Sequence, residues 1–211
     1  MKNIRHIIFD LGGVIINIDP GAVKRKLITG GFGNVDLLDR HLHDQGFFHG
    51  IETGVVGPEG FRDAVRDFLG VPMDDKAIDE VWNAMILDIP PARIRFMTRL
   101  KSRYKLYLLS NTNAIHHSFY DAYFRDTFDY PGLGAFFTQT WYSFMMGVRK
   151  PDPEIFRMAL SDGRIDASET AFIDDLEENT LAAASVGIHP CHLSPGREIM
   201  DLFDEKLELI I

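Results

Sequence analysis

The stretch His6–Val14, HIIFDLGGV, decides the fold of this chain. Its first part, His6–Asp10, is a short apolar run that ends in a carboxylate, and Gly12 and Gly13 follow directly. A short run without polar alternation is typical of a strand that is buried on both faces of a parallel sheet. A carboxylate is costly to bury without a partner, and glycine lets a backbone approach a ligand closely. The stretch therefore predicts a buried strand that ends either in a functional site or in a simple loop cap at Asp10.

Further apolar runs of the same kind follow along the chain. They are Lys105–Ser110, Phe136–Ser143, Thr170–Asp175 and a weaker run, Gly187–Leu193, which contains Pro190. Helical patterns lie at 91–103, 153–161 and 177–186, and Asp152 with Pro153 is a typical helix start. This alternation predicts an α/β protein with a doubly wound parallel sheet and right-handed crossovers.

The segment from about residue 17 to residue 90 breaks this rhythm, because it contains no convincing strand. Helices are expected near 20–29, 35–45, 58–69 and 74–87, separated by glycines and prolines. We therefore expect a small all-helical insertion at 17–90. The core would then consist of residues 1–16 and 91–211.

Composition narrows the classes of function. The chain has 211 residues, 22 Lys and Arg against 31 Asp and Glu, and a net charge of −9, which disfavours binding to nucleic acid. Its single cysteine, Cys191, allows neither an internal disulfide nor a cysteine zinc cluster. The N-terminus resembles a buried strand rather than a signal peptide, and no apolar run reaches the roughly 18 residues of a membrane span. We therefore expect a cytoplasmic protein without a membrane partner.

Polar residues at the carboxyl ends of the expected strands are the candidates for chemistry, because ligands of open α/β sheets bind there. Adjacent carboxylates at Asp174 and Asp175 repel each other unless a cation or a shared proton intervenes. Mg²⁺ is bound by one or two carboxylates and water, so Asp10 with one of this pair predicts a metal site. The alternatives are a helix cap at the acidic pair, a turn cap at Ser110 and Asn111, and a solvated surface position for Lys150.

Four short motifs occur in the order found in the haloacid dehalogenase superfamily, and together they resemble it over the whole chain. They are Phe9–Val14 (FDLGGV), Leu108–Asn113 (LLSNTN), Arg149–Pro153 (RKPDP) and Phe172–Asp175 (FIDD) followed by Asn179. The resemblance implies a Rossmann-like core with a helical cap at 17–90. Most members of the superfamily are phosphatases, so it also implies a hydrolase of phosphoric monoesters.

The roles of individual residues follow from this resemblance. Asp10 would be the nucleophile that forms an aspartyl-phosphate, and Lys150 would neutralise charge on it and on the phosphate. Ser110 and the amide groups at Asn111 would bind phosphate oxygens, and His116 is a candidate near the leaving group.

The same resemblance implies a set of metal ligands. Mg²⁺ would be held by Asp10, the main-chain carbonyl of Gly12 and Asp175. Asp174 would lie behind the metal or serve as an occasional ligand. Glu52, at the start of a Glu-Thr-Gly turn, is expected in a loop over the site.

One position departs from the family pattern. The usual first motif has a second aspartate that protonates the leaving oxygen, and Gly12 occupies that position here. Together with the other motifs, this is similar to the bacterial α-glucose-1-phosphate phosphatase branch. We therefore expect a small phosphorylated substrate, with an anomeric sugar phosphate favoured. The alternatives are a metal-free dehalogenase, which the acidic pair opposes, and a catalytically weak binding or regulatory protein; the oligomeric state stays open.

Overall fold

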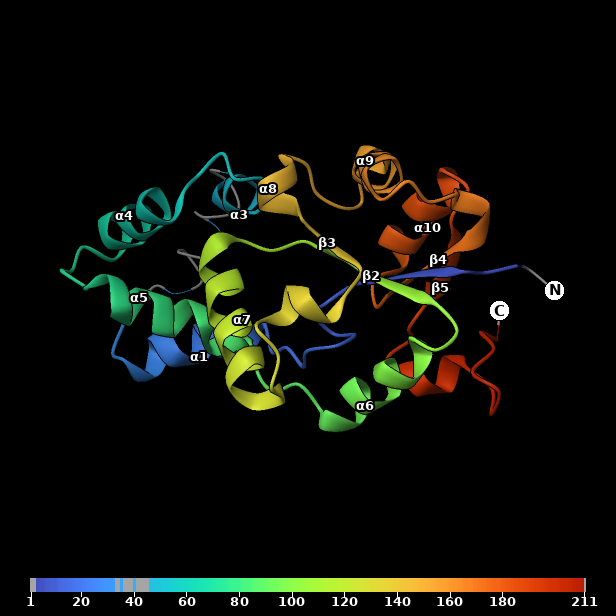
Figure 1. The fold of residues 1–211 in the computed structure, drawn as a ribbon. Helices are drawn as coiled ribbons and strands as arrows, with labels where there is room; N and C mark the ends of the chain where they lie inside the picture. Colours follow the sequence, from blue (N-terminus) through green and yellow to red (C-terminus); the bar gives the residue numbers. More distant parts are fainter. Residues whose placement is uncertain (1–2, 33–34, 36–39, 41–45, 211) are drawn as a thin grey trace.

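A five-stranded parallel sheet forms the centre of the protein (Figure 1). The computed structural model describes residues 3–32, 35, 40 and 46–210. The strand order is β3-β2-β1-β4-β5. The strands are β1 (His6–Phe9), β2 (Lys105–Ser110), β3 (Gln139–Tyr142), β4 (Thr170–Asp174) and β5 (His189–His192).

The later strands of the sheet lie on both sides of β1, and ligands of such sheets bind where the strand order reverses in this way. Phe9 is paired with Leu108 of β2 on one side and with Ile173 of β4 on the other. The first crossovers build β2 and β3, and the later ones build β4 and β5 on the opposite side. The carboxyl ends of β1 and β4 therefore meet at the topological switch point of the sheet.

Helices cover both faces of the sheet, which explains the continuous apolar runs in the strands (Figure 1). Ile7 and Phe9 of β1 pack into the core on the side of α6 and α7, whereas Ile8 packs into the core on the side of α9 and α10. The helical elements outside the insertion are α6 (Pro91–Leu100), α7 (Ala114–Phe128), η2 (Leu133–Phe136), α8 (Ser143–Met146), α9 (Pro153–Gly163), η3 (Ala167–Glu169), α10 (Glu177–Ser185) and η4 (Ile199–Leu202).

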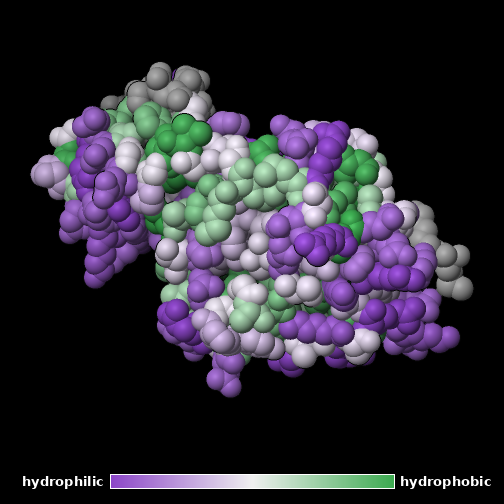
Figure 2. Space-filling view, turned by 45° about the horizontal axis from the view of Figure 1, so that its top comes forward, coloured by the Kyte–Doolittle hydropathy of each residue, from purple (hydrophilic) through white to green (hydrophobic). Residues whose placement is uncertain are grey.

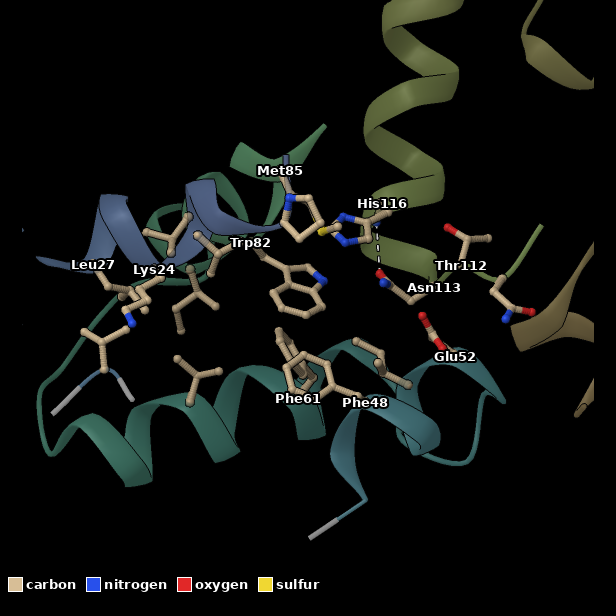
Figure 3. A pocket seen from close by; sticks show the side chains of 18 of the residues that line it. Lys24, Leu27, Phe48, Glu52, Phe61, Trp82, Met85, Thr112, Asn113 and His116 are labelled. Carbon is tan, nitrogen blue, oxygen red and sulfur yellow. Dashed lines mark hydrogen bonds between the residues drawn. The ribbon is translucent and has the colours of Figure 1, made fainter. Parts of the chain in front are cut away.

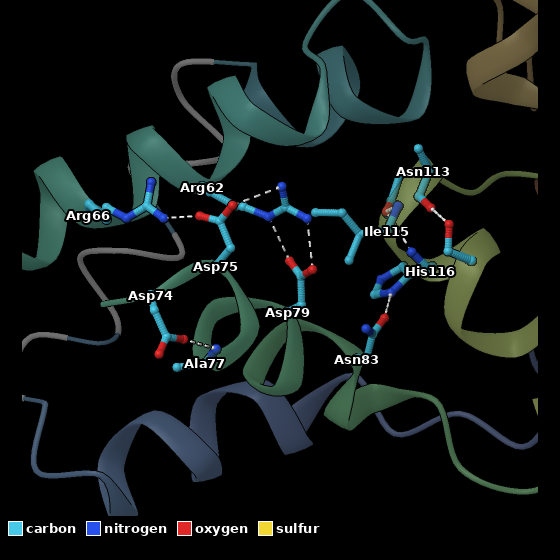
Figure 4. A network of polar contacts seen from close by, with 12 residues as sticks. Arg62, Arg66, Asp74, Asp75, Ala77, Asp79, Asn83, Asn113, Ile115 and His116 are labelled. Carbon is cyan, nitrogen blue, oxygen red and sulfur yellow. Dashed lines mark hydrogen bonds and ion pairs between the residues drawn. The ribbon is translucent and has the colours of Figure 1, made fainter. Parts of the chain in front are cut away.

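Between β1 and α6 the described chain is helical and lies beyond the carboxyl ends of the strands (Figure 1). Its elements are α1 (Gly21–Thr29), α3 (Phe47–Glu52), α4 (Pro58–Leu69), α5 (Asp75–Trp82) and η1 (Asn83–Met85). These helices have their own apolar cluster, in which Phe61, Ile78 and Trp82 are buried. Arg62 of α4 donates to both carboxylate oxygens of Asp79 in α5, at 2.9 and 2.8 Å, and so fastens these two helices together (Figure 4).

Both ends of the helical segment are paired with each other. The Asn17 N–H donates to the Asp88 carbonyl, the Leu87 N–H donates to the Asn17 carbonyl, and both distances are 2.9 Å. Next to these contacts, Ile18 and Ile86 form an antiparallel bridge. The segment therefore leaves the sheet and returns to it at one place.

The structure confirms the predicted α/β fold with a doubly wound parallel sheet and refines several elements. The expected strand at Phe136–Ser143 is shorter, because its first residue belongs to η2 and its last begins α8. The weak strand with Pro190 is an edge strand, where a missing N–H is tolerated. Helix α3 was not predicted, and the helix expected at 35–45 lies largely outside the described residues.

No helix among the described residues is both long and apolar enough to span a membrane. Figure 2 shows a surface on which hydrophilic side chains are interspersed with smaller hydrophobic patches.

Candidate active site

Lys150 lies between two carboxylates at the switch point of the sheet. Its Nζ donates to Oδ1 of Asp10 at 2.6 Å and to Oδ2 of Asp174 at 2.7 Å. Asp10 follows the last residue of β1, and Asp174 is the last residue of β4. Lys150 is 1% exposed, so the expectation of a pinned lysine holds and the alternative of a solvated one does not.

Burial and charge act in opposite directions on these groups. Burial raises the pKa of Asp10 to about 7, although the neighbouring Lys150 ammonium opposes this increase. Burial alone would lower the pKa of Lys150, but Asp10 and Asp174 together hold it above its ordinary value. Lys150 therefore stays charged, and Asp10 needs positive charge in addition to this ammonium to be fully ionised at neutral pH.

The two adjacent aspartates have different surroundings. Asp174 is fully buried, and its oxygens also accept hydrogen bonds from the Leu176 N–H at 2.8 Å and the Asn179 amide at 3.0 and 3.1 Å. The carboxylate of Asp175 is half-buried, and no other described residue donates a hydrogen bond to it. Burial, and next the charge of Asp174, raise the pKa of Asp175. Several hydrogen bonds thus hold the Asp174 carboxylate in place, whereas the oxygens of Asp175 are available to a ligand.

The residues fit a divalent cation. Asp10, Asp174 and Asp175 each offer an oxygen, and these atoms lie within 4.8 Å of one another. Three carboxylates against one ammonium leave a local negative charge that Mg²⁺, which prefers oxygen ligands, would neutralise. No described residue donates a hydrogen bond to the carbonyl of Gly12, so this oxygen is also available.

Gly13 makes room for this arrangement. Its φ of +74° lies in the left-handed region, and a Cβ atom there would lie 2.3 Å from Oδ2 of Asp175. Any larger residue would push the Asp175 carboxylate out of the position it has here. The glycine pair was expected to let the backbone approach a ligand, and at Gly13 the close neighbour is a carboxylate of the site itself.

Asn111 fixes the main chain of Lys150. Its side-chain amide donates to the Lys150 carbonyl at 2.9 Å, and its side-chain oxygen accepts the Lys150 N–H at 2.9 Å. This pair of bonds fixes the side chain against the Lys150 main chain, and the main-chain N–H of Asn111 is available for the predicted phosphate contact. Ser110 is 2% exposed at the end of β2, and its hydroxyl makes one long contact, 3.4 Å, to the Asn111 carbonyl.

His116 lies against the insertion rather than beside Asp10. Its ring stacks on Trp82 with centroids 5.0 Å apart, and Nδ1 lies 2.8 Å from Oδ1 of Asn83 (Figure 4). Because the Asn83 oxygen can only accept, Nδ1 carries the proton. Burial lowers the pKa of His116 to about 3, so the ring is neutral. Its Nε2 is a buried acceptor that has no partner among the described residues.

The expected loop at Glu52 is the end of a short helix that touches the core. Glu52 is the last residue of α3, and its carboxylate lies 3.0 Å from a guanidinium nitrogen of Arg149, next to Lys150. Burial raises the pKa of Glu52, while the Arg149 charge opposes the rise. A Cβ atom at Gly54 would lie 2.3 Å from the Phe144 carbonyl, so the turn approaches α8 closely. The partner of Glu52 could not be predicted from the sequence, because Arg149 lies 97 positions further along the chain.

A cavity of about 310 Å³ extends from these residues into the insertion (Figure 3). At the end towards the core its lining is polar and includes Glu52, Thr112, Asn113 and His116. The remaining wall is mainly apolar and comes from α1, α4, α5 and neighbouring residues. Its apolar lining residues include Val23, Leu27, Phe48, Phe61, Val65, Ile78, Val81, Trp82 and Met85.

A buried aspartate at the switch point of a doubly wound sheet, paired with a lysine beside two further carboxylates, defines a class of hydrolase in which a carboxylate can act as the nucleophile. The family model of the haloacid dehalogenase-like hydrolases matches residues 4–187, and the chain belongs to this family.

Relatives of known activity cover most of the chain. It is 29% identical over 186 residues to a D-ribitol-5-phosphate phosphatase from Bacteroides thetaiotaomicron, covering 87% of this chain and 89% of that protein. It is 28% identical over 191 residues to a sesquiterpene phosphatase from Aspergillus oryzae, covering 89% and 88%. A solved structure of a family enzyme from B. thetaiotaomicron, in complex with magnesium and inorganic phosphate, superimposes with a TM-score of 0.86 at 34% identity, over 95% of this chain and all of that one.

These comparisons confirm the predicted family and the prediction of a hydrolase. The magnesium prediction agrees with the metal in that solved structure and with the cluster of Asp10, Asp174 and Asp175 here. The roles of the individual site residues stay predictions.

Proposed function

We propose that the protein is a Mg²⁺-dependent phosphatase that hydrolyses a small phosphorylated metabolite through an aspartyl-phosphate on Asp10. The observation that carries this proposal is the placement of Lys150 between Asp10 and Asp174, with the free carboxylate of Asp175 beside them. A phosphoryl group and a carboxylate are both negatively charged, so the attack requires positive charge close to both of them.

Each residue has a defined task in this proposal. An oxygen of Asp10 attacks phosphorus, and the leaving oxygen departs as an alkoxide with the bonding electrons and takes up a proton from water. Water then attacks the phosphorus of the acyl phosphate, which releases inorganic phosphate and regenerates Asp10. Lys150 neutralises the nucleophile and the phosphate. Ser110 and the main-chain N–H of Asn111 bind phosphate oxygens. Mg²⁺, when bound by Asp10, the Gly12 carbonyl and Asp175, would supply further positive charge at the phosphate.

We further propose that residues 17–90 act as a cap over a core of residues 1–16 and 91–211. The Glu52–Arg149 ion pair and the His116–Asn83 hydrogen bond support the position of this cap. Both connect the helical segment to the carboxyl edge of the sheet, where Asp10 lies. A cytoplasmic location is part of the same proposal, and the single cysteine of the chain is in keeping with it.

The absence of an acid at position 12 shapes the proposed substrate preference. Two residues could in principle protonate the leaving oxygen instead, His116 and Asp19. His116 is neutral and its one ring proton is held by Asn83 at Nδ1. The hydrogen bond from Arg25 lowers the pKa of Asp19 and keeps it ionised, so neither residue is a ready proton donor. The leaving oxygen must then carry most of its charge alone. We therefore propose that anomeric sugar phosphates and aryl phosphates are cleaved faster than 6-phosphates of the same sugars.

The decisive experiment measures phosphate release from p-nitrophenyl phosphate with Mg²⁺ and with EDTA, for the wild type and Asp10→Asn. We expect turnover only with Mg²⁺, and a loss of more than about 100-fold in kcat for the variant, which removes the attacking charge and keeps the shape. Turnover that survives exhaustive chelation would favour the metal-free dehalogenase chemistry instead. A matched comparison of glucose 1-phosphate with glucose 6-phosphate then tests the role of Gly12, and equal kcat/KM values would contradict it.

A further inference from the structure

Beyond its polar end, the described residues that line the cavity in Figure 3 do not offer the hydrogen-bond partners that a polyol requires. A sugar or pentitol presents a hydroxyl on nearly every carbon, and each buried hydroxyl costs free energy unless it finds a hydrogen-bond partner. Beyond the polar end, the residues that line the cavity are mainly aliphatic, aromatic and methionine side chains. Several of them, such as Phe61 and Ile78, are almost completely buried.

Polar groups in the cavity are concentrated at one end. Asn111, Thr112 and Asn113 follow β2 directly, and Asn111 is bonded to the main chain of Lys150. The polar end of the cavity is therefore the end that adjoins the proposed phosphate site. Lys24 lies at the opposite end of the view in Figure 3, and apolar side chains occupy the space between.

His116 gives an independent indication that the cavity holds a ligand. His116 is one of the residues that line the cavity. Its Nε2 is buried and has no partner among the described residues, while Nδ1 is held by Asn83. A buried acceptor without a partner costs about 1–3 kcal/mol, which a donor from a bound molecule or its water would recover. The stack on Trp82 keeps the ring in this orientation.

We infer that the alcohol part of the substrate is an apolar body of about ten non-hydrogen atoms, such as an alkyl-substituted aromatic or a terpene-like group, and not a polyol. This inference rests on the proposed phosphatase function. It keeps the proposed preference for a good leaving oxygen, as in an aryl phosphate, and replaces the sugar by an apolar alcohol. The distribution of polar and apolar side chains matches a molecule with a phosphate head and an apolar body. The size follows from the cavity volume of about 310 Å³, taking ~30 Å³ for each group of the size of a water molecule.

The test is a series of phenyl phosphates with 4-methyl, 4-ethyl, 4-propyl, 4-butyl and 4-octyl substituents. Their leaving oxygens have nearly the same basicity, so the series changes apolar size and leaves the chemistry constant. We expect kcat/KM to rise about twofold to fourfold per CH₂ group up to butyl, and to level off or fall at octyl, where the body exceeds the cavity. A matched polar probe, 4-(2,3-dihydroxypropyl)phenyl phosphate, should be at least about tenfold worse than the 4-propyl compound.

A variant of the wall gives a second readout. Val65→Thr replaces a lining methyl with a hydroxyl at nearly constant volume and should lower the butyl-to-methyl ratio about threefold. Val55→Thr is the matched control, because Val55 is 83% exposed and does not line the cavity; its ratio should equal that of the wild type. If Val65→Thr does not fold, the series on the wild type decides alone.

The outcomes separate this inference from the proposed function. If 4-methylphenyl phosphate is turned over with Mg²⁺ but kcat/KM is flat or falls from methyl to butyl, the apolar substrate class is wrong and the phosphatase stands. A dihydroxypropyl compound as good as the propyl compound would overturn the inference in the same way. No Mg²⁺-dependent turnover of any member would overturn both.

Discussion

Replacing Lys150 by methionine should show how strongly the site depends on its buried ammonium. Methionine has nearly the same length, so the change removes the charge and leaves the packing largely intact. Lys150 is 1% exposed and makes contacts of 2.6 and 2.7 Å with Asp10 and Asp174. With an effective dielectric constant of about 20, each contact is worth about 6 kcal/mol of attraction. Most of this is offset by the cost of burying the charges, and breaking such a pair typically costs about 3–5 kcal/mol.

The expected result is therefore a loss of about 3–5 kcal/mol in the free energy of unfolding at pH 8 without metal. The loss should be smaller at pH 5. Burial already raises the pKa of Asp10 to about 7, and the loss of Lys150 raises it further, so at pH 5 Asp10 is protonated and the repulsion from Asp174 is relieved.

Urea unfolding followed by circular dichroism, in EDTA and at both pH values, measures these differences. The control is a double-mutant cycle with Asp10→Asn, which removes one of the two carboxylates that Lys150 contacts. In the Asp10→Asn background, Lys150→Met should cost at least about 1 kcal/mol less than in the wild type. The reasoning is refuted if Lys150→Met costs under about 1 kcal/mol at pH 8, or if the two substitutions are additive.

Three further predictions concern other residues of the candidate site. Gly13→Ala should weaken Mg²⁺ binding, measured by calorimetry, because its Cβ would displace the Asp175 carboxylate. Gly147→Ala is the control, since Gly147 has the same φ of +74° and open space around it. It should cost a similar backbone strain, about 1–2 kcal/mol, and leave the Mg²⁺ affinity unchanged. Asp175→Asn should weaken Mg²⁺ binding with little loss of stability, whereas Asp174→Asn, which has several buried partners, should lower the free energy of unfolding; the reverse pattern would contradict the assignment. The pKa of His116 is lowered to about 3, so an unfolded chain takes up a proton below its usual value of 6.5 while the folded chain does not, and stability falls with decreasing pH through this window. At pH 4.5 the loss is about 2.7 kcal/mol relative to pH 8, and equal pH profiles for the wild type and His116→Gln would exclude this role.

The residues that meet around Lys150 could be predicted from the sequence because they follow directly from strand ends. Asp10 and Asp174 end buried apolar runs, and neighbouring parallel strands bring their carboxyl ends to one edge. The choice between Asp174 and Asp175 came from the resemblance to the family. The structure adds the physical difference: Asp174 accepts several hydrogen bonds, whereas no other described residue donates a hydrogen bond to the carboxylate of Asp175.

Other features of the site could not be predicted, since they depend on contacts between distant segments. The side chain of Asn111 binds main-chain atoms of Lys150, and main-chain partners leave no pattern in the side chains. Helix α3 has only six residues, too few to show helical periodicity, and it carries Glu52 to the core. The apolar character of the cavity emerges only when α1, α4 and α5 are packed together.

The paired ends of the helical segment have a consequence for how such a protein can change over time. Hydrogen bonds between Asn17 and Asp88 bring the two ends of the helical segment together, so the chain enters and leaves the core at one place. Insertions, deletions or wholesale exchange of those helices would leave the register of β1 with β2 and β4 untouched. The apolar wall of the cavity, which these helices supply, can therefore change while the carboxylates around Lys150 keep their places.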